Sequence, residues 1–255
     1  MNNLFFILFI SLPFSLLTDY PLKDGRPTSK GIEQYVEDNG ESFILEYQKF
    51  IGDTLYDIWV YADDLTQYDV HDSLELGRYY PNEIFVSTAE LFLAYELADL
   101  SQDQKDKIVE SNKFVKSTVM HELTHDYFNQ ISVEMRIIDS IQVNKAYQTN
   151  LWIIRSYENF GSTFIEEGVC EYVVEKMGEI IPPKTPYIPT SIQDLTNRNN
   201  SYKVNYKYSS YYLKNFLDTL GFKKGVKMLL YNPPPTYEEI LKPELFYGRL
   251  EKFEE

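Results

Sequence analysis

Apolar and polar positions in the first part of the chain predict two helices followed by a strand. Residues 31–36 and 42–50 mix apolar and charged side chains at helical spacing, and Asn39-Gly40 between them favours a break. Residues 56–61 are rich in aromatic and β-branched side chains and are followed by Asp63-Asp64, which is typical of a strand. We therefore expect two short helices and one strand in this part of the chain.

The middle of the chain predicts a second strand and two further helices. Residues 83–87 form a strand candidate, and the pattern over 88–100 is that of an amphipathic helix. Ser101 and Gln104 form a capping box at the start of a long helix, which we place over 101–129. The apolar positions that recur at helical spacing in this helix are Ile108, Phe114, Val115, Val119 and Leu123.

The C-terminal half of the chain predicts mainly helices. Residues 131–160 have mixed helical and loop character without ligand chemistry, and a helix over 164–175 follows and ends near Gly178. Three further segments complete the expectation: a proline-rich connector over 181–189, a helix over 206–220 ended by Gly221, and a short helix over 223–230.

Length and composition limit the fold class and the partners. The chain has 255 residues, of which 44% are apolar, enough to build a real core. We expect a single domain over 19–255 of the α+β class, mainly α-helical, with a small sheet-containing part at about 50–100 and a helical part over 160–255. The formal net charge of -15 argues against a nucleic-acid partner, because no basic stripe is present to neutralise phosphates.

The N-terminal residues 1–18 are set apart from the fold. Residues 4–17 are almost uninterruptedly apolar, too short for a comfortable membrane span but of the length of a signal-peptide core. The preceding Met1-Asn2-Asn3 carries no Lys or Arg and no cleavage site stands out, so either an exported protein or one anchored at the membrane by this segment fits. Cys170 is the single cysteine, which excludes an internal disulfide.

The segment His121-Glu122-Leu123-Thr124-His125 carries the clearest chemistry in the chain. Two imidazoles at positions i and i+4 project from one helical face, about 6 Å apart, and can bind a single zinc ion. Glu122 is the next residue round the helix, so its carboxylate can act on the attacking water without binding the metal. This pattern predicts metal-assisted hydrolysis.

A third metal ligand is expected from a carboxylate. His71 lies in a polar, acidic loop and is expected to be a solvated residue rather than a ligand. A histidine-elongated motif is absent, because Phe128 occupies its glycine position. The helix over 164–175 is the best source, and Glu167-Gly168 is its most distinctive pair, since a glycine beside a ligand lets two helices approach closely around an ion.

These motifs resemble those of the gluzincin metallopeptidases. His121 to His125 is identical to the thermolysin segment, and Glu167-Gly168 with Tyr172 looks like the ligand helix of that family. The resemblance implies a zincin-like, thermolysin-type catalytic domain in which Glu167 is the third zinc ligand and Glu166 a rival. It also implies that Glu171 orients a ligand histidine.

The resemblance extends into the C-terminal part. The helix over 206–220 is similar to the zinc aminopeptidase helix whose tyrosine hydroxyl stabilises the oxyanion, which implies that role for Tyr206, with Tyr208 as a rival. Cys170 stands where the family usually has alanine, and we expect a buried small hydrophobe rather than a reactive thiol. The tail over 233–244 resembles that of several bacterial and archaeal gluzincin-like proteins.

The resemblance implies zinc-dependent hydrolysis of peptide or protein substrates by an exported metallopeptidase. Endopeptidase action is mildly favoured, because no exopeptidase motif of the G-x-M-x-N type is present. Strand 83–87 is expected either to edge the sheet above the cleft, where it could pair with substrate, or to be internal. Two other classes stay open: a non-catalytic zinc-binding or regulatory protein that retains the peptidase fold, and a membrane-anchored scaffold.

Overall fold

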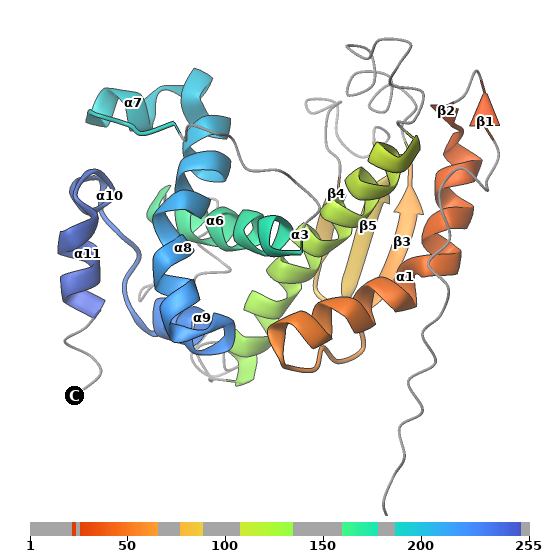
Figure 1. The fold of residues 1–255 in the computed structure, drawn as a ribbon, viewed down its shortest axis with the longest axis horizontal. Helices are drawn as coiled ribbons and strands as arrows, with labels where there is room; N and C mark the ends of the chain where they lie inside the picture. Colours follow the sequence, from red (N-terminus) through yellow and green to blue (C-terminus); the bar gives the residue numbers. More distant parts are fainter. Residues whose placement is uncertain are drawn as a thin grey trace, which may run out of the picture.

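The computed structural model describes residues 22–23, 26–65, 77–88, 108–134, 160–177 and 187–250 (Figure 1). Several expectations lie outside these residues: the N-terminal apolar segment, His71, nearly all of the helix over 88–100, the start of the long helix, most of the stretch over 131–160, Gly178 and most of the proline-rich connector. In the part that is described, the fold is α+β and mainly helical, with a small three-stranded sheet.

The sheet combines one parallel and one antiparallel pair. Its strands are β3 (Trp59–Asp63), β4 (Gly77–Tyr80) and β5 (Glu83–Ser87), in the order β3-β5-β4. β5 runs parallel to β3 and antiparallel to β4, with Gly77 opposite Val86. A separate two-residue pairing joins β1 (Leu22–Lys23) to β2 (Arg26–Pro27).

β5 has the bounds predicted from the sequence, and it is the central strand of the sheet. Of the two alternatives, the internal strand is therefore correct. The edge of the sheet that packs against the long helix is β4, which the sequence analysis did not anticipate. The strand expected over 56–61 is present but shifted toward the C-terminus, as β3.

The expected break at Asn39-Gly40 is wrong, because α1 (Ser29–Ile51) runs through it as one helix. Asn39 is buried and its side-chain amide donates to the carbonyl of Tyr35, one turn back. A Cβ on Gly40 would lie 3.3 Å from the Cβ of Val60, so glycine allows the helix to pack closely on β3. Tertiary packing therefore outweighs the weak local preference of these two residues.

Helices make up the rest of the described structure. The long helix is α3 (Ile108–Glu134), which continues past the predicted end at 129, and α6 (Phe160–Lys176) begins before the predicted 164. The predicted helix over 206–220 consists of a π-helical segment, η5 (Lys203–Tyr208), followed by α8 (Ser209–Leu220). Gly221 ends α8 with φ 81°, as expected of glycine at a helix end. The remaining helices are α7 (Ile192–Thr196), η4 (Arg198–Asn200), α9 (Phe222–Tyr231), α10 (Tyr237–Leu241) and α11 (Pro243–Leu250).

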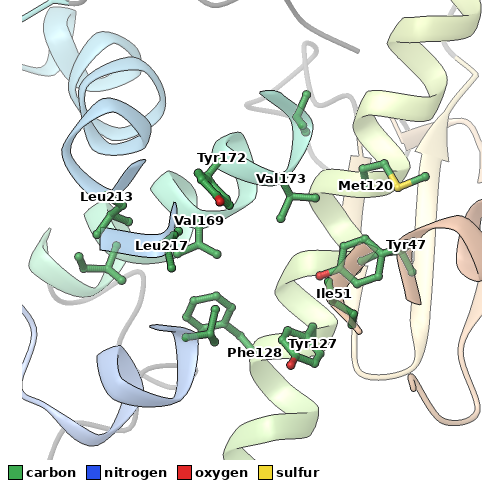
Figure 2. Packing of buried hydrophobic residues seen from close by; sticks show 14 of the residues in the cluster. Tyr47, Ile51, Met120, Tyr127, Phe128, Val169, Tyr172, Val173, Leu213 and Leu217 are labelled. Atoms are coloured by element: carbon green, nitrogen blue, oxygen red, sulfur yellow. The ribbon is translucent and has the colours of Figure 1, made fainter. Parts of the chain in front are cut away.

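α3 is central to the packing. α1 packs against β3, whereas α3 packs against β4 and β5 on one side and against α6 on the other (Figure 1). Figure 2 shows the buried side chains that fill these contacts: Tyr47 and Ile51 from α1, Tyr127 and Phe128 from α3, Val169 and Val173 from α6, and Leu213 and Leu217 from α8. The helix that carries the histidines is thus held from both sides.

Gly168 allows a close approach between α6 and the start of α8. A Cβ at this position would lie 2.7 Å from the Cβ of Ser209 and 2.9 Å from its carbonyl carbon. A backbone atom cannot move aside by a change of rotamer, so a larger residue would push the two helices apart. Glycine was expected to let two helices approach closely around an ion, whereas the approach found at Gly168 is to α8 and not to the histidine helix α3.

We predict that Gly168→Ala lowers the free energy of unfolding by about 1–3 kcal/mol, because it overpacks this contact. Urea denaturation of the purified protein measures the change. Gly248→Ala in α11 is the matched control, because a Cβ there has nothing within 4 Å. Equal stability of Gly168→Ala and Gly248→Ala would contradict the tight packing.

Candidate metal centre

Two helices bring the candidate ligands together. α3 contributes His121 and His125 one turn apart, and α6 contributes Glu166 and Glu167 from the facing side. The imidazole Nε2 atoms lie 3.3 Å apart. Oε2 of Glu167 lies 3.1 Å from Nε2 of His121 and 3.9 Å from Nε2 of His125. Three donor atoms from two helices therefore converge on one point.

The spacing of these donors fits a shared metal ion. Nitrogen and oxygen ligands about 2.0–2.2 Å from one tetrahedral ion lie about 3.3–3.5 Å from each other. The observed separations are 3.1, 3.3 and 3.9 Å, so one lies within this range, one just below it and one above it. Glu167 is only 7% exposed, and its Oε2 has no hydrogen-bond partner among the described residues. A buried carboxylate oxygen without a hydrogen bond is costly unless a cation compensates it.

Cys170 offers a second set of donors with the same two imidazoles. His121, His125 and Cys170 each present a ligand atom within 4.8 Å of the others, and this group could hold a metal ion. The thiol is fully buried. Its pKa is raised well above the usual range, mainly by burial and to a smaller extent by the charges of nearby carboxylates. We favour Glu167 over Cys170, because its Oε2 lies 3.1 Å from Nε2 of His121 and the pKa of its carboxyl is lowered, whereas the pKa of the thiol is raised by burial and by nearby carboxylates.

A carboxylate lies beside the Nδ1 atom of each imidazole, on the side opposite Nε2. Nδ1 of His125 lies 2.7 Å from Oε1 of Glu166, and Nδ1 of His121 lies 3.4 Å from Oε1 of Glu171. Carboxylates in this position fix the tautomer and direct Nε2 toward a metal. Glu166 therefore lies on the Nδ1 side of His125, away from the point where the Nε2 atoms converge, and Glu171 lies on the Nδ1 side of His121. Lys207 is 3.5 Å from Glu171 and was not anticipated from the sequence.

The acids also determine the protonation of the cluster. Burial alone would lower the pKa of both histidines, but Glu167 and Glu171 raise the pKa of His121 well above its usual range, and Glu166 and Glu167 raise that of His125. Burial would raise the pKa of Glu167, but its contacts with the imidazoles lower it. A metal ion would replace protons on the imidazoles, so metal affinity should increase with pH.

Of the two candidate tyrosines, Tyr206 lies at the centre. Its ring stacks on His121 with centroids 5.9 Å apart and planes at 17°, and its hydroxyl group is one of the influences that lower the pKa of Glu167. Burial and nearby carboxylates raise its pKa, so the hydroxyl keeps its proton. Tyr208 lies elsewhere, because its hydroxyl donates to the carbonyl of Ile240 at 2.9 Å. The π-helical segment, a feature frequent at functional sites, places Tyr206 here.

Strand β4 borders the centre and was missed by the sequence analysis. Tyr79 stacks on His125 with ring centroids 6.1 Å apart, and Gly77 lies against Glu122. Asp126 on α3 accepts the backbone N–H of Asn82 at 3.0 Å, which ties the β4–β5 turn to the helix. The aromatic pair before Pro81-Asn82 was an available hairpin signal, because asparagine tolerates the positive φ of 72° found there.

Glu122 faces the same region. It is 9% exposed, and its charge raises the pKa of both His121 and Tyr206. Its side chain is close enough to β4 that a Cβ on Gly77 would lie 2.8 Å from its Oε1. The carboxylate therefore occupies the space between the edge strand and the histidines, where it can exchange protons with a water molecule.

Comparisons of the chain with protein-family models, with curated proteins and with solved structures find no match in any of the three. The side chains of this protein itself are therefore the guide to its function. The most informative of them are the convergent donors on α3 and α6 and the carboxylates that contact the imidazoles.

We predict that Glu167→Ala abolishes tight zinc binding, whereas Glu166→Gln weakens it by about 10–100-fold, as expected for a carboxylate that orients a ligand. Titration calorimetry of the metal-free protein with zinc measures both affinities. Glu175→Gln is the control on the same helix, because Glu175 pairs with Lys214 and not with a histidine. The ligand assignment fails if Glu167→Ala binds zinc as tightly as the unaltered protein.

Proposed function

We propose that this protein is a zinc-dependent metallopeptidase of the gluzincin type, which hydrolyses peptide bonds. The observation that carries the proposal is the convergence of Nε2 of His121, Nε2 of His125 and Oε2 of Glu167 within 3.9 Å of one another. Glu122 on the same helix is the acid that hydrolysis requires and a purely structural site does not. The family resemblance of the sequence motifs supports the same conclusion.

Zinc is the metal that suits these donors best. Two imidazoles and one carboxylate are a known ligand set of catalytic zinc sites, and three protein ligands leave one position open for water or substrate. When bound, zinc supplies Lewis acidity, which lowers the pKa of water and polarises a carbonyl group. His121, His125 and Glu167 would hold the ion, with Glu166 and Glu171 orienting the two imidazoles.

The protein's own groups divide the remaining chemistry between them. Glu122 accepts a proton from the attacking water at its carboxylate and later passes it to the leaving amine. The hydroxyl of Tyr206 donates a hydrogen bond to the carbonyl oxygen as negative charge develops there. The raised pKa of Tyr206 suits this role, because the group must remain protonated at neutral pH in order to donate.

Export and substrate choice are parts of this proposal that rest on the sequence alone. Among the described residues, no helix has both the length and the apolar character that a membrane crossing needs. The apolar segment over 4–17 is proposed to direct the protein out of the cytoplasm or to anchor it. Endopeptidase action remains the favoured mode.

A second candidate function is tight metal binding without hydrolysis. Cys170 favours it, because its sulfur is grouped with His121 and His125 within 4.8 Å. A thiolate added to the two imidazoles and Glu167 would supply four protein ligands, and structural zinc sites are closed in this way. Such a centre would have no position left for substrate.

We predict that Glu122→Gln retains zinc but loses peptidase activity, because the amide keeps the size of the side chain and cannot accept a proton. Mass spectrometry of a mixed peptide library incubated with zinc-loaded residues 19–255 reports the cuts, and elemental analysis reports the metal content. Glu175→Gln is again the control and should cut as the unaltered protein does. Substantial hydrolysis by Glu122→Gln would refute the assigned role.

We predict that the cobalt-substituted protein lacks the intense near-ultraviolet absorption of a thiolate-to-cobalt bond, and that Cys170→Ala binds cobalt with unchanged affinity. This result follows if the three ligands are His121, His125 and Glu167. A strong thiolate band that disappears in Cys170→Ala would instead support the closed, non-catalytic centre. The absorption spectrum separates the two candidates without any substrate.

A further inference from the structure

Gly77 lies at the first position of β4, directly against the helix that carries the candidate general base. A Cβ at this position would lie 2.5 Å from Cγ2 of Thr118 and 2.8 Å from both Cγ and Oε1 of Glu122. Real Cβ atoms essentially never approach other atoms so closely, so no side chain fits without movement. The space that a side chain would fill is occupied by the carboxylate of Glu122.

We propose that Gly77 is a positioning residue, whose missing side chain gives the carboxylate of Glu122 its place beside the metal ligands. The inference rests on the proposed function for its catalytic consequence, but the placement of Glu122 can be tested apart from hydrolysis. Gly77 acts through Glu122, and its backbone forms the wall against which this carboxylate rests.

The strand cannot easily retreat from a larger residue at this position. β4 is paired along its length with the central strand β5, where Gly77 lies opposite Val86. The turn that follows is tied to α3 through the bond from the backbone N–H of Asn82 to Asp126, and Tyr79 is stacked on His125. α3 is itself packed between the sheet and α6. The flexible part of the contact is therefore the side chain of Glu122.

A side chain at position 77 should affect the general base, Glu122, and not the proposed metal ligands. The three nearest atoms that a Cβ on Gly77 would meet belong to Thr118 and Glu122, and none of these three belongs to a proposed metal ligand. Alanine at this position should displace the Glu122 carboxylate and leave the metal ligands in place. A displacement of about 1 Å in a reacting group can reduce turnover about a hundredfold.

The test compares Gly77→Ala with Gly77→Ala/Thr118→Ser, Glu122→Gln and the control Gly248→Ala. Serine at position 118 removes Cγ2, the atom of the tightest contact, while the contact with Glu122 remains. If Gly77→Ala alone does not fold, the double variant is therefore measured in its place. Melting temperature and zinc content are measured for each protein.

Acetohydroxamic acid is the probe for the carboxylate, because a hydroxamate on a metal hydrogen-bonds to an acid beside it. We expect Gly77→Ala and the double variant to retain zinc, to bind acetohydroxamic acid as weakly as Glu122→Gln does, and to show kcat lowered about a hundredfold with KM little changed. Gly248→Ala should match the unaltered protein in every measurement.

Three results would overturn the inference. They are hydroxamate binding by the double variant equal to that of the unaltered protein, recovery of kcat when Thr118→Ser is added to a folded Gly77→Ala protein, and loss of zinc from a folded double variant. The first two would assign the effect to Thr118, and the last would make Gly77 a structural residue. Absence of peptide hydrolysis in the unaltered protein would count against the proposed function alone, because the hydroxamate measurement does not require turnover.

Discussion

The close contact between α3 and α6 is the constraint on which the rest of the structure depends. It places the charges of Glu122, Glu166, Glu167 and Glu171 around two imidazoles in a buried region. Even if both imidazoles were protonated, the acids would leave an excess of negative charge there. Buried charges are costly unless they are compensated, and a divalent cation is often the largest compensating charge in such a site. The arrangement of the acids therefore supports the proposed metal site.

The sequence predicted those parts of the centre that are set by local geometry. His121, Glu122 and His125 belong to one helix, so their relative positions follow from the helical repeat alone. Glu167 became a candidate because its motif resembles a known ligand helix, and the structure places its Oε2 3.1 Å from Nε2 of His121. The position of Glu166 depends on how α6 is rotated against α3, and only the structure shows that its carboxylate contacts Nδ1 of His125, whereas a place for Glu171 beside a histidine was already implied by the resemblance.

Where sequence reasoning failed, tertiary contacts outweighed local preference. Asn39 and Gly40 are a common turn signal, yet packing against β3 keeps them helical. Tyr206 and Tyr208 could not be separated by sequence, because they lie on different faces of the helix and the sequence does not show which face is turned toward the histidines. The π-helical segment changes the direction of side chains within it, and such a segment has no clear sequence pattern. β4 was missed because it is only four residues long, and the hairpin signal at Pro81-Asn82 that follows it was overlooked.

The two imidazoles are held in unequal ways. His125 is fixed between the ring of Tyr79 and a buried carboxylate, Glu166, at 2.7 Å. His121 is stacked on Tyr206, and its carboxylate, Glu171, is shared with Lys207 at 3.5 Å. Nδ1 of His125 lies 2.7 Å from its carboxylate, whereas Nδ1 of His121 lies 3.4 Å from Glu171, so His125 has the closer contact. The pKa of His121 is nonetheless raised well above its usual range, because Glu167 and Glu171 both act on it. Close packing therefore fixes His125, whereas the charges of two acids act on His121.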